Sequence, residues 1–404
     1  MKILHISHLY PVFYDKFYGK AIHSQIKEIA KRGVDAKVIS PIPWTPFPIQ
    51  YLSSKWKKYS EIPRKTFWEG IEVYHPRYLD FPKALFFSSS GKRMYRGIQK
   101  LVDEIYKGDL VSRFARNKSF KFDLIHAHMA LPDGYAAVLL KEKYKKPLIL
   151  SLRSSDLNIS IFRNKKIFNI IQRVANQANT VLVPSPYLQK RARKYLNIDP
   201  IVVPNGIDLN DIFQGKSRIL EKYRGKRIIL SASRLIKIKG IDFNLRAIAR
   251  LKEKYPNLLY LIIGDGPEKR SLENLVKDLK IEKEVEFLGP QSHKKTMEYM
   301  SICDIFSTPS WQETFGLVYL EAMANGKPVI GCQDQGVDGI VKEKETGLLV
   351  KQKDVDSLVI AIDFLLSNPE KAKEIGERAK KLVLENYTWE KAIKKLVGIY
   401  KNLT

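Results

Sequence analysis

Hydrophobic residues along this chain fall into short runs of strand length that alternate with segments of helical spacing. Strand-like runs separated by helical patterns such as SQIKEIAKRG and YAAVLLKEKY are typical of parallel α/β layers. Because 404 residues exceed what one hydrophobic core usually covers, each half of the chain is expected to form its own doubly wound sheet. The strand-like runs are KILHIS, DAKVIS, EVYHP, DLIHAH, PLILSL, TVLVPS and PIVVPN in the first half, and RIILSAS, LLYLIIG, VEFLG, IFSTPS, PVIGC and GLLV in the second.

Two further patterns mark the organisation of the chain. The stretch PNGIDLNDIF at 204–213 is rich in Pro, Asn, Gly and Asp, which are typical of a connector. At the C-terminus, YTWEKAIKKLVGIYKNL carries apolar residues at helical spacing, and Thr388 can cap that helix. A terminal helix with such an apolar stripe is expected to dock on another part of the protein.

The segment 44–101 differs from the rest of the chain because it mixes aromatic and basic residues and shows weak periodicity. It contains SSKWKKYSEIPRKTFW and, further on, FPKALFFSSSGKRMYRGIQK. Two interpretations are open. The segment is either a membrane- or acceptor-facing insertion, or an ordinary long loop and helix that cover the sheet.

Cysteine content and hydropathy narrow the class of protein. The two cysteines, Cys303 and Cys332, argue against a disulfide framework and fit a reducing compartment. No apolar run approaches the roughly 20 residues that span a bilayer. The N-terminal MKILHISHLYP enters an apolar strand at once, without the longer apolar core of a signal peptide. We therefore expect a cytoplasmic protein.

The net charge of +27 is unevenly distributed along the chain. Residues 1–200 hold 36 Lys and Arg against 15 Asp and Glu, so most of the positive excess lies in the first half. A polyanionic partner, either nucleic acid or an anionic membrane surface, is one explanation. A solvated, lysine-rich surface is the other.

Loops that follow the predicted strands carry the candidate chemistry, because parallel sheets bind ligands at the carboxyl ends of their strands. Arg234 and Lys239 follow RIILSAS on one loop and form a clamp suited to a diphosphate, with a solvated loop as the alternative. Gly264 and Gly266, after LLYLIIG, allow the backbone to approach a ligand closely. The sequence contains neither GxGxxG nor GxxxxGK[ST], so dinucleotide hydride transfer and P-loop chemistry have no direct support.

The stretch ETFGLVYLE places Glu313 and Glu321 eight residues apart in an otherwise apolar run. In one continuous helix they would lie about 12 Å apart and about 80° around the axis, which is poor geometry for one shared site. We predict instead that Glu313 lies in a loop and that a helix begins near Gly316 or Leu317. The backbone N–H groups of Phe315 to Val318 then suit a phosphate, and the flanking carboxylates suit the vicinal hydroxyls of a sugar and a ribose.

This Glu-x7-Glu spacing, followed by AMANGKPVIG, resembles the donor motif of the family-4 retaining glycosyltransferases of GT-B architecture. The resemblance covers nearly the whole chain. It includes SASRLIKIKGIDFNLRAIARL, GDGPEKRSLENL, VEFLGPQSHKKTMEYMSICDIFSTPS and GVDGIVKEKETGLLV in the second half, and the opening strand with Gly19, DLIHAHMALPDG, SLRSSDLN and VVPNGID in the first.

The resemblance implies an α/β fold of two Rossmann-like doubly wound parallel-sheet domains that face a central cleft. Residues 1–208 plus about 386–404 would form the acceptor-binding domain, and residues 209–385 the domain that binds the nucleotide-sugar donor. The C-terminal helix would cross back to the first domain.

The resemblance also implies roles for the residues singled out above. Glu313 would contact the donor sugar hydroxyls and Glu321 the ribose hydroxyls, while Arg234 and Lys239 would stabilise the departing diphosphate. The remaining donor-binding residues would be Gly19, Gly264, Gly266, Phe315, Gly316, Leu317 and Val318.

Such a mechanism requires neither a metal nor a cofactor. A literal DxD, Asp354-Val-Asp356, follows the GLLV strand and opens a helix. We interpret its acids as capping and helix-dipole residues and not as a metal site.

Two departures from the family pattern concern the first half. Many members carry a Gly-Gly pair where this chain reads Tyr18-Gly19-Lys20, and a His-Gly pair where it reads Arg153-Ser154. Arg153 is expected either to bind a phosphate or to pair with Asp156. His128 is then the remaining histidine candidate on the acceptor side, with a supporting structural role as the alternative.

The expected function is transfer of a sugar, with retention, from a UDP- or GDP-sugar to a lipid-linked or polysaccharide acceptor in cell-surface glycan biosynthesis. The exopolysaccharide and teichuronic-acid types are the most similar members. The expected location is the cytoplasm, with peripheral attachment to the inner face of the membrane. One alternative is a soluble-acceptor disaccharide synthase of the sucrose or trehalose type. The other is a basic nucleic-acid-binding protein, which would leave the donor motif unexplained.

Overall fold

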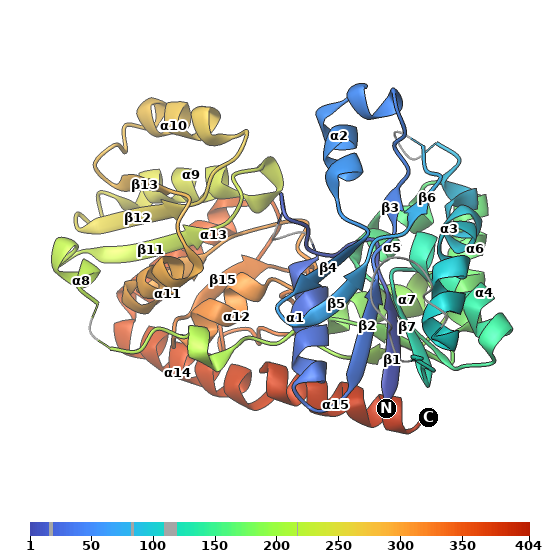
Figure 1. The fold of residues 1–404 in the computed structure, drawn as a ribbon. Coiled ribbons are helices and arrows are strands. Elements are labelled where there is room, and N and C mark those ends of the chain that lie inside the picture. Colours follow the sequence, from blue (N-terminus) through green and yellow to red (C-terminus); the bar gives the residue numbers. More distant parts are fainter. Residues whose placement is uncertain (16–18, 82–84, 109–118, 216) are drawn as a thin grey trace. The chain divides into compact units, whose positions relative to one another are not determined.

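The computed structural model describes residues 1–15, 19–81, 85–108, 119–215 and 217–404 (Figure 1). Tyr18, one of the departures from the family pattern, lies outside these residues. The chain divides into two compact units. Unit 1 comprises 1–184, 188–203 and 393–404, and unit 2 comprises 185–187 and 204–392. Each unit is built on its own sheet, as the alternating pattern predicted.

The main sheet of unit 1 has eight strands in the order β10-β9-β8-β7-β1-β2-β5-β4. Every neighbouring pair is parallel except β4 and β5, which are antiparallel. A separate parallel pair joins β3 to β6. The strands are β1 Lys2–Ile6, β2 Asp35–Ile39, β3 Ile42–Pro43, β4 Lys65–Trp68, β5 Ile71–Tyr74, β6 Arg77–Tyr78, β7 Leu124–His128, β8 Leu148–Ser151, β9 Thr180–Val183 and β10 Ile201–Val202.

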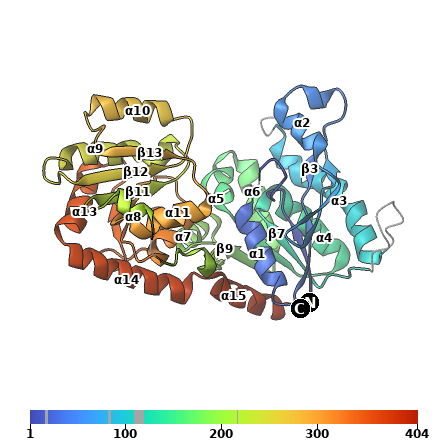
Figure 2. The same cartoon turned by 60° about the vertical axis from the view of Figure 1, so that its left-hand side comes forward.

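Helices cover both faces of this sheet, so its central strands are buried throughout (Figures 1 and 2). The first helix shows why the sequence folds this way, because its apolar residues recur on one face and bury Ile22, Ile26 and Ile29. The α-helices are α1 Lys20–Ala30, α2 Ser54–Glu61, α3 Ser90–Lys107, α4 Tyr135–Tyr144, α5 Ser154–Asn158, α6 Lys165–Gln177 and α7 Pro186–Leu196.

Unit 2 contains a six-stranded parallel sheet in the order β13-β12-β11-β14-β15-β16. Its strands are β11 Arg227–Ala232, β12 Leu258–Ile263, β13 Val285–Gly289, β14 Ile305–Ser307, β15 Val329–Cys332 and β16 Leu348–Val350. Its helices are α8 Ile219–Lys222, α9 Ile241–Leu251, α10 Lys269–Asp278, α11 His293–Ile302, α12 Leu317–Ala324, α13 Val355–Ser367 and α14 Pro369–Asn386.

Alternate residues of the unit 2 strands point to opposite faces and form two separate cores. Ile228 and Leu230 of β11 pack with α11, α12 and α14, whereas Ile229 packs with α9, α10 and α13. These two layers hold the strand ends rigidly, and the loops that follow β11, β12 and β14 leave from the carboxyl edge of the sheet.

The C-terminal helix α15, Trp389–Lys401, confirms the prediction of a docked terminal helix. Thr388 Oγ1 accepts a hydrogen bond from the backbone N–H of Lys391 at 3.3 Å and so caps it. From Ile393 onward the helix belongs to unit 1, although the chain before it belongs to unit 2. There the buried Tyr400 hydroxyl lies 2.6 Å from His126 Nδ1.

The aromatic and basic segment 44–101 forms ordered elements in its described part, from β4 and β5 to helices α2 and α3. Helix α2 buries none of its side chains. Eight large apolar side chains in the described part of the segment are exposed, namely Trp44, Phe47, Tyr51, Leu52, Phe67, Leu79, Leu85 and Phe86. Among the described residues, no helix is both long enough and apolar enough to cross a membrane.

Candidate functional site

The start of helix α12 is the centre of the candidate site in unit 2. The helix begins at Leu317, and Gly316 precedes it in the left-handed region with φ of 76°, which confirms the predicted loop-to-helix transition. A Cβ on Gly316 would lie 2.5 Å from the ring of Tyr319. Glycine is therefore required here both for its backbone conformation and for its lack of a side chain.

Backbone N–H groups at this helix start are not used by other described parts of the protein. Within the described part of the chain, no hydrogen bond uses the N–H groups of Phe315, Gly316, Leu317 or Val318. The first amides of a helix have no partner inside the helix, and the helix dipole places partial positive charge there. This end of α12 is accordingly suited to an anion.

Glu313 and Lys239 form an ion pair beside the helix start. Lys239 Nζ donates to Glu313 Oε2 at 2.7 Å, and the two side chains are 19% and 14% exposed. Glu313 Oε1 accepts from the Thr314 N–H at 3.1 Å. Lys239 reaches this position because its loop packs against residues 309–311, where Trp311 N–H donates to Ile238 O.

Arg234 lies on the same loop, after β11, and its side chain is exposed. Among the described residues, its guanidinium has no hydrogen bond or ion pair within the protein. The loop therefore carries Lys239, which is paired with Glu313, and Arg234, which is available to a ligand.

The loop after β15 supports Glu313 from the other side. Gln335 Oε1 accepts from the Glu313 N–H at 3.1 Å, and the Gly336 N–H donates to Glu313 O at 2.8 Å. A Cβ on Gly336 would lie 2.0 Å from the Thr314 carbonyl carbon, so only glycine allows this approach. The sequence gave no signal for these two contacts.

Gly264 and Gly266 contact backbone and not open space. A Cβ on Gly264 would lie 1.8 Å from Ser233 O, and one on Gly266 would lie 2.3 Å from Leu235 O. Leu235 N–H also donates to Asp265 O at 2.9 Å. These glycines hold the loop after β12 against the loop that carries Arg234, which is a contact that sequence reasoning did not foresee.

Glu321 lies one turn into α12 and is held by a histidine that sequence reasoning missed. His293, the first residue of α11, approaches Glu321 Oε1 with Nε2 at 3.0 Å and Asp211 Oδ2 with Nδ1 at 3.7 Å. A cavity of about 480 Å³ adjoins His293 and is also lined by residues 210–214. The two glutamates thus have different partners, Lys239 for one and His293 for the other.

Asp354 confirms its interpretation as a capping residue. Its Oδ1 accepts from the Ser357 N–H at 3.1 Å at the start of α13, and Asp356 pairs with Arg250. The DxD carboxylates are therefore used within unit 2.

A second group of polar residues lies in unit 1. Arg153 Nη2 donates to His128 Nδ1 at 3.2 Å, so these two candidates do meet. Asp156 Oδ2 accepts from the Arg153 backbone N–H at 2.8 Å, and its Oδ1 accepts from Ala130 N–H at 3.0 Å. Asp156 thus contacts the backbone of Arg153 at the start of α5, and the Arg153 side chain contacts His128. Burial raises the pKa of Asp156 to about 7.

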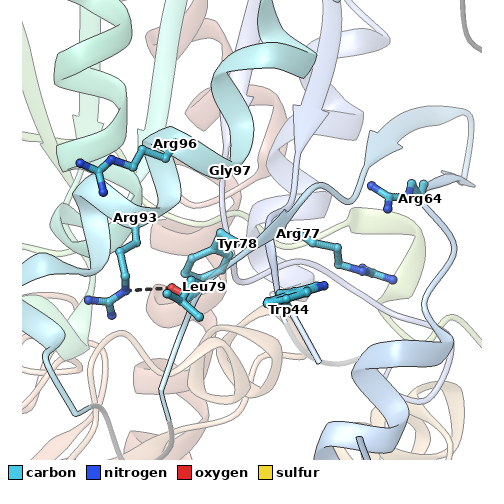
Figure 3. Close-up of a pocket in the computed structure, with 8 residues that line it drawn as sticks. All are labelled: Trp44, Arg64, Arg77, Tyr78, Leu79, Arg93, Arg96 and Gly97. Carbon is cyan, nitrogen blue, oxygen red and sulfur yellow. Dashed lines mark hydrogen bonds between the residues drawn. The ribbon is translucent and has the colours of Figure 1, made fainter. Parts of the chain in front are cut away.

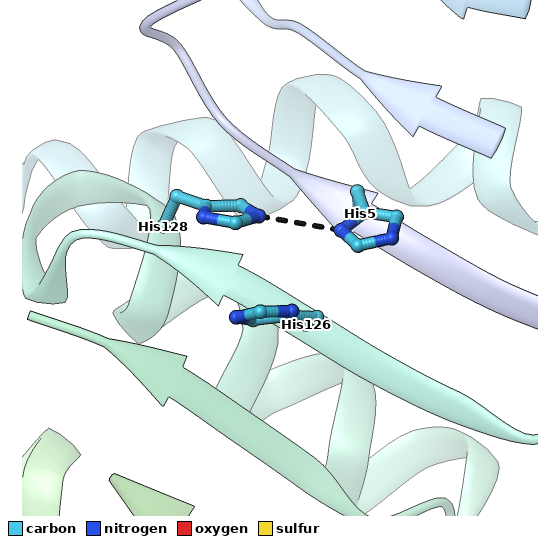
Figure 4. Close-up of side chains that lie close together, drawn as sticks. All are labelled: His5, His126 and His128. Carbon is cyan, nitrogen blue, oxygen red and sulfur yellow. Dashed lines mark hydrogen bonds between the residues drawn. The ribbon is translucent and has the colours of Figure 1, made fainter. Parts of the chain in front are cut away.

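His128 belongs to a column of three buried imidazoles (Figure 4). Arg153 donates a hydrogen bond to His128 Nδ1, so the proton of the neutral His128 ring is on Nε2. His128 Nε2 then donates to His5 Nδ1, and these two atoms are 3.2 Å apart. His126 lies between Tyr400 and Ser151, with a partner at each nitrogen. Burial lowers the pKa of all three, that of His5 to about 3, so they are neutral.

One ring nitrogen from each of these three histidines lies within 4.8 Å of the others, a spacing that could suit a metal. However, the lone pairs of His128 and His5 accept the hydrogen bonds just described, and both nitrogens of His126 are occupied. A metal would have to break this network beside a cationic Arg153, so these residues do not fit a metal site.

His8 and Asp133 are further polar residues of unit 1 that sequence reasoning missed. Asp133 is fully buried and accepts from the His8 backbone N–H at 2.7 Å, and its second oxygen lies 2.5 Å from His8 Nδ1. Burial alone would lower the pKa of His8, but the charge and hydrogen bond of Asp133 raise it overall. His8 also lines a cavity of about 350 Å³ with Tyr10, Tyr14, Tyr59, Tyr78 and Asp80.

Gly19 lies at the start of α1 with φ of 69°, and a Cβ there would lie 2.4 Å from Leu9 O. It brings the helix start close to the loop after β1. Its observed role is therefore tight packing of that loop.

The fold and the two groups of residues define a class of protein. Two doubly wound sheets, one of them with an anion-suited helix start flanked by cations and carboxylates, are the architecture of the GT-B glycosyltransferases. The chain belongs to the family-4 glycosyltransferases of GT-B architecture. Residues 213–382 match the model of the "Glycosyl transferases group 1" family, and residues 19–211 match that of "Glycosyltransferase Family 4".

Two curated relatives illustrate the family. TuaC of Bacillus subtilis, a glycosyltransferase whose name places it in teichuronic acid biosynthesis, is 31% identical over 90% of this chain and 88% of its own length. N-acetyl-alpha-D-glucosaminyl L-malate synthase of Bacillus anthracis is 30% identical over 69% of this chain and 74% of its own length.

Solved structures share the fold at lower identity. Sucrose-phosphate synthase of Thermosynechococcus elongatus superimposes with a TM-score of 0.78 at 20% identity, covering 100% of this chain and 99% of its own. HepE of Anabaena, solved in complex with UDP and glucose, has a TM-score of 0.72 at 20% identity and covers 100% of both chains. These likenesses bear on the fold alone.

Proposed function

We propose that this glycosyltransferase moves a sugar from a nucleoside diphosphate sugar, with UDP or GDP as the nucleotide, to a glycan acceptor, with retention of anomeric configuration. The observation that carries the proposal is the start of α12. Amides that have no partner among the described residues lie there between Glu313, which pairs with Lys239, and Glu321, which pairs with His293. A sugar, a diphosphate and a ribose need these three kinds of group in this order.

In the proposed mechanism, the bond between the anomeric carbon and the donor phosphate breaks while a bond to the acceptor oxygen forms on the same face. The nucleoside diphosphate leaves with the electron pair and accepts the acceptor hydroxyl proton. Arg234, Lys239 and the amides at the start of α12 stabilise the charge that develops on the leaving phosphate. Glu313 holds the sugar hydroxyls and Glu321 the ribose hydroxyls.

The cations of the β11 loop support a reaction without a metal or a cofactor. Two side-chain cations and a helix start can neutralise a diphosphate, which is the role that a divalent ion otherwise has in phosphoryl chemistry. Gly264 and Gly266 contribute by fixing the loop that carries Arg234, and Gly19 is proposed to contribute from unit 1.

The acceptor is proposed to be a polysaccharide or a lipid-linked glycan, and unit 1 to bind it through His128, Arg153 and Asp156. The name of TuaC supports the polysaccharide class. The likeness to sucrose-phosphate synthase is compatible with a soluble disaccharide acceptor but does not favour it, because it reports the fold alone. No observation favours nucleic acid as the partner.

Peripheral attachment to anionic membranes on the cytoplasmic side is proposed from the composition of unit 1. The exposed apolar residues of segment 44–101 lie in the half of the chain that carries most of the positive excess. Sedimentation with anionic vesicles at low salt but not at high salt is expected. Absence of sedimentation at both salt concentrations would contradict the attachment.

Thermal-shift screening against UDP-, GDP- and ADP-sugars tests the donor class. A ligand at 100 times its Kd raises the free energy of unfolding by about 2.7 kcal/mol, which is measurable as a higher Tm. One nucleotide class is expected to raise the Tm well above the others. Equal, negligible shifts with all three would refute a nucleotide-sugar donor.

A further inference from the structure

Unit 1 contains a cavity of about 420 Å³ that is lined by four arginines from three separate segments (Figure 3). Arg64 precedes β4, Arg77 opens β6, and Arg93 and Arg96 lie one turn apart on α3. Trp44, Tyr78, Leu79 and Gly97 complete the lining. None of these arginines belongs to the residues discussed above, so the function as proposed leaves the cavity unexplained.

The charge of this cavity is only partly compensated within the protein. Arg93 is occupied, because Nε donates to Leu79 O at 2.8 Å and Nη2 lies 3.4 Å from Asp80 Oδ1. In the described part of the chain, the side chains of Arg64 and Arg96 have no hydrogen bond or ion pair, and both residues are exposed. Among the described residues, Asp80 is the one carboxylate that pairs with any of these four arginines.

Arg77 is the most constrained of the four. Its Nη2 donates to Ile62 O, whereas its Nη1 is fully buried and has no partner among the described residues. Burial, and secondarily the charge of Arg64, lower the pKa of Arg77. A buried guanidinium N–H without an acceptor, next to a second arginine, is costly unless an anion completes the site.

Gly97 shows that the arginines are brought together by close packing. A Cβ on Gly97 would lie 2.6 Å from Tyr78 Cβ and 2.7 Å from Arg77 O. The missing side chain lets α3 lie directly against β6, so the helix that carries Arg93 and Arg96 adjoins the strand that carries Arg77, with the two sets of side chains on opposite sides of Tyr78 (Figure 3). The cavity is thus a property of the packed elements and not of one flexible loop.

The size and charge of the cavity indicate the kind of ligand. Arginine forks match phosphate oxygens in pairs, and several forks around one site suit a group with more than one charge. One carboxylate would neutralise one arginine and leave the charge of the others uncompensated. A phosphate monoester or a diphosphate fits this arrangement better.

The neighbouring cavity identifies where the rest of the ligand would lie. Tyr78 lines both the arginine cavity and the 350 Å³ cavity that contains His8, and Asp80, which pairs with Arg93, lines the second. The second cavity presents tyrosine rings and carboxylates, which are the groups that bind sugar rings and hydroxyls.

We infer that the arginine cavity binds the phosphate or diphosphate group of the acceptor, whose sugar occupies the neighbouring cavity of His8 and Tyr78. This inference rests on the proposed glycosyltransfer, and it specifies the acceptor as a phosphorylated or diphosphorylated sugar. The phosphate can come from a lipid-linked sugar or from a soluble sugar phosphate, because both present the same group to the arginines.

Binding of inorganic pyrophosphate, measured by calorimetry, tests the cavity directly. The measurement uses the full chain with Arg234→Gln and Lys239→Gln, so that the proposed donor site does not contribute. Adding Arg64→Gln and Arg96→Gln is expected to weaken the remaining binding by roughly tenfold or more. Both side chains are exposed, so the variant should fold as the parent does. Arg173→Gln on α6, also exposed and outside the cavity, is the matched control and should leave binding unchanged.

Absence of pyrophosphate binding in the parent, or equal binding with and without the two arginines, would overturn the inference. Arg77→Gln provides a second variant, with the Tm recorded to confirm folding. Stronger binding of glucuronate than of pyrophosphate would also overturn it, because it would assign the cavity to a carboxylate.

Two further arms distinguish the sources of the phosphate. With otherwise wild-type protein, a soluble glycosyl phosphate and a vesicle-bound glycosyl diphospholipid are compared as acceptors. In the Arg64→Gln, Arg96→Gln variant, the KM for the preferred phosphorylated acceptor should rise roughly tenfold, while donor-induced thermal shifts remain those of the wild type. Loss of donor shifts in the wild type would instead refute the proposed function.

Discussion

Replacement of Lys239 tests the donor site through a group whose position is defined by an ion pair. In the structure Lys239 Nζ lies 2.7 Å from Glu313 Oε2, and both side chains are less than one-fifth exposed. To bind the donor diphosphate, Lys239 leaves this carboxylate wholly or in part. Lys239→Gln removes the charge but keeps a hydrogen-bonding group, and Lys239→Met removes both.

The expected magnitude follows from two opposing contributions. A hydrogen bond between ions contributes about 1.5–3 kcal/mol, so its loss alone would weaken donor binding about 10- to 150-fold. Release from Glu313 offsets part of this, because the wild type gives up that contact when the donor binds. Exposed ion pairs contribute up to about 1 kcal/mol to stability, and we use this value for the contact between Lys239 and Glu313. We therefore expect the Kd for the nucleoside diphosphate to rise about 2- to 30-fold.

Isothermal titration calorimetry with UDP and GDP measures this change. Lys237→Gln is the matched control, because Lys237 lies on the same short helix but is exposed. Lys239→Gln combined with Glu313→Gln completes a double-mutant cycle, and the two changes should not be additive because the side chains are in contact. An unchanged Kd in Lys239→Gln, or an equal loss in the Lys237 control, would refute the assigned role.

Three further predictions concern the helix start, the buried histidines and the metal. Gly316→Ala should lower the free energy of unfolding by about 1–3 kcal/mol and weaken donor binding, because φ is 76° and the new Cβ would meet Tyr319. Urea titrations measure this loss. Gly398→Ala, where a Cβ meets nothing within 4 Å, is the control. Burial lowers the pKa of His5 to about 3 from its ordinary value of 6.5. As the pH falls below 6.5, His5 is therefore protonated in the unfolded chain before it is protonated in the folded protein, and the free energy of unfolding decreases until the pH reaches about 3. At pH 5 the loss in the free energy of unfolding is about 2 kcal/mol, and in urea titrations at pH 7 and pH 5 the His5→Gln variant should lack it. Asp156, whose pKa is raised, changes the stability in the opposite direction, but it does so equally in both proteins. A variant that loses as much stability as the wild type between pH 7 and pH 5 would contradict the assignment. Sugar transfer should persist in excess EDTA, whereas its loss and recovery with added Mg²⁺ would overturn the metal-independent mechanism.

Features that depend on local sequence were predicted well. The strand runs and the start of α12 at Leu317 follow from hydrophobic periodicity and glycine position, which act over a few residues. The cap by Thr388 and the cap by Asp354 are equally local. The antiparallel β4 was not predicted, because its short run in the aromatic and basic segment has weak alternation.

Contacts between distant residues could not be predicted in the same way. His293 is 28 residues from Glu321, and His8 is 125 residues from Asp133. Each is an ordinary polar residue in its own segment, and its role arises only when the fold brings two distant segments together. The arginine cavity is similar, since it depends on Gly97 packing against β6.

The glycines after β12 illustrate a different limit. The sequence predicted that Gly264 and Gly266 allow the backbone to approach a ligand closely. The structure places Ser233 and Leu235 there. Lack of a side chain indicates that something is close, and only the fold identifies what it is.

The central claim is that Glu313 binds the donor sugar and Glu321 the ribose, on either side of the start of α12. The most direct test measures the Kd of Glu313→Gln and Glu321→Gln for the nucleotide sugar and for the free nucleoside diphosphate. We expect Glu313→Gln to weaken nucleotide-sugar binding about tenfold or more without weakening nucleoside diphosphate binding, and Glu321→Gln to weaken both. Equal weakening of both ligands by Glu313→Gln, or no weakening by either variant, would contradict the account.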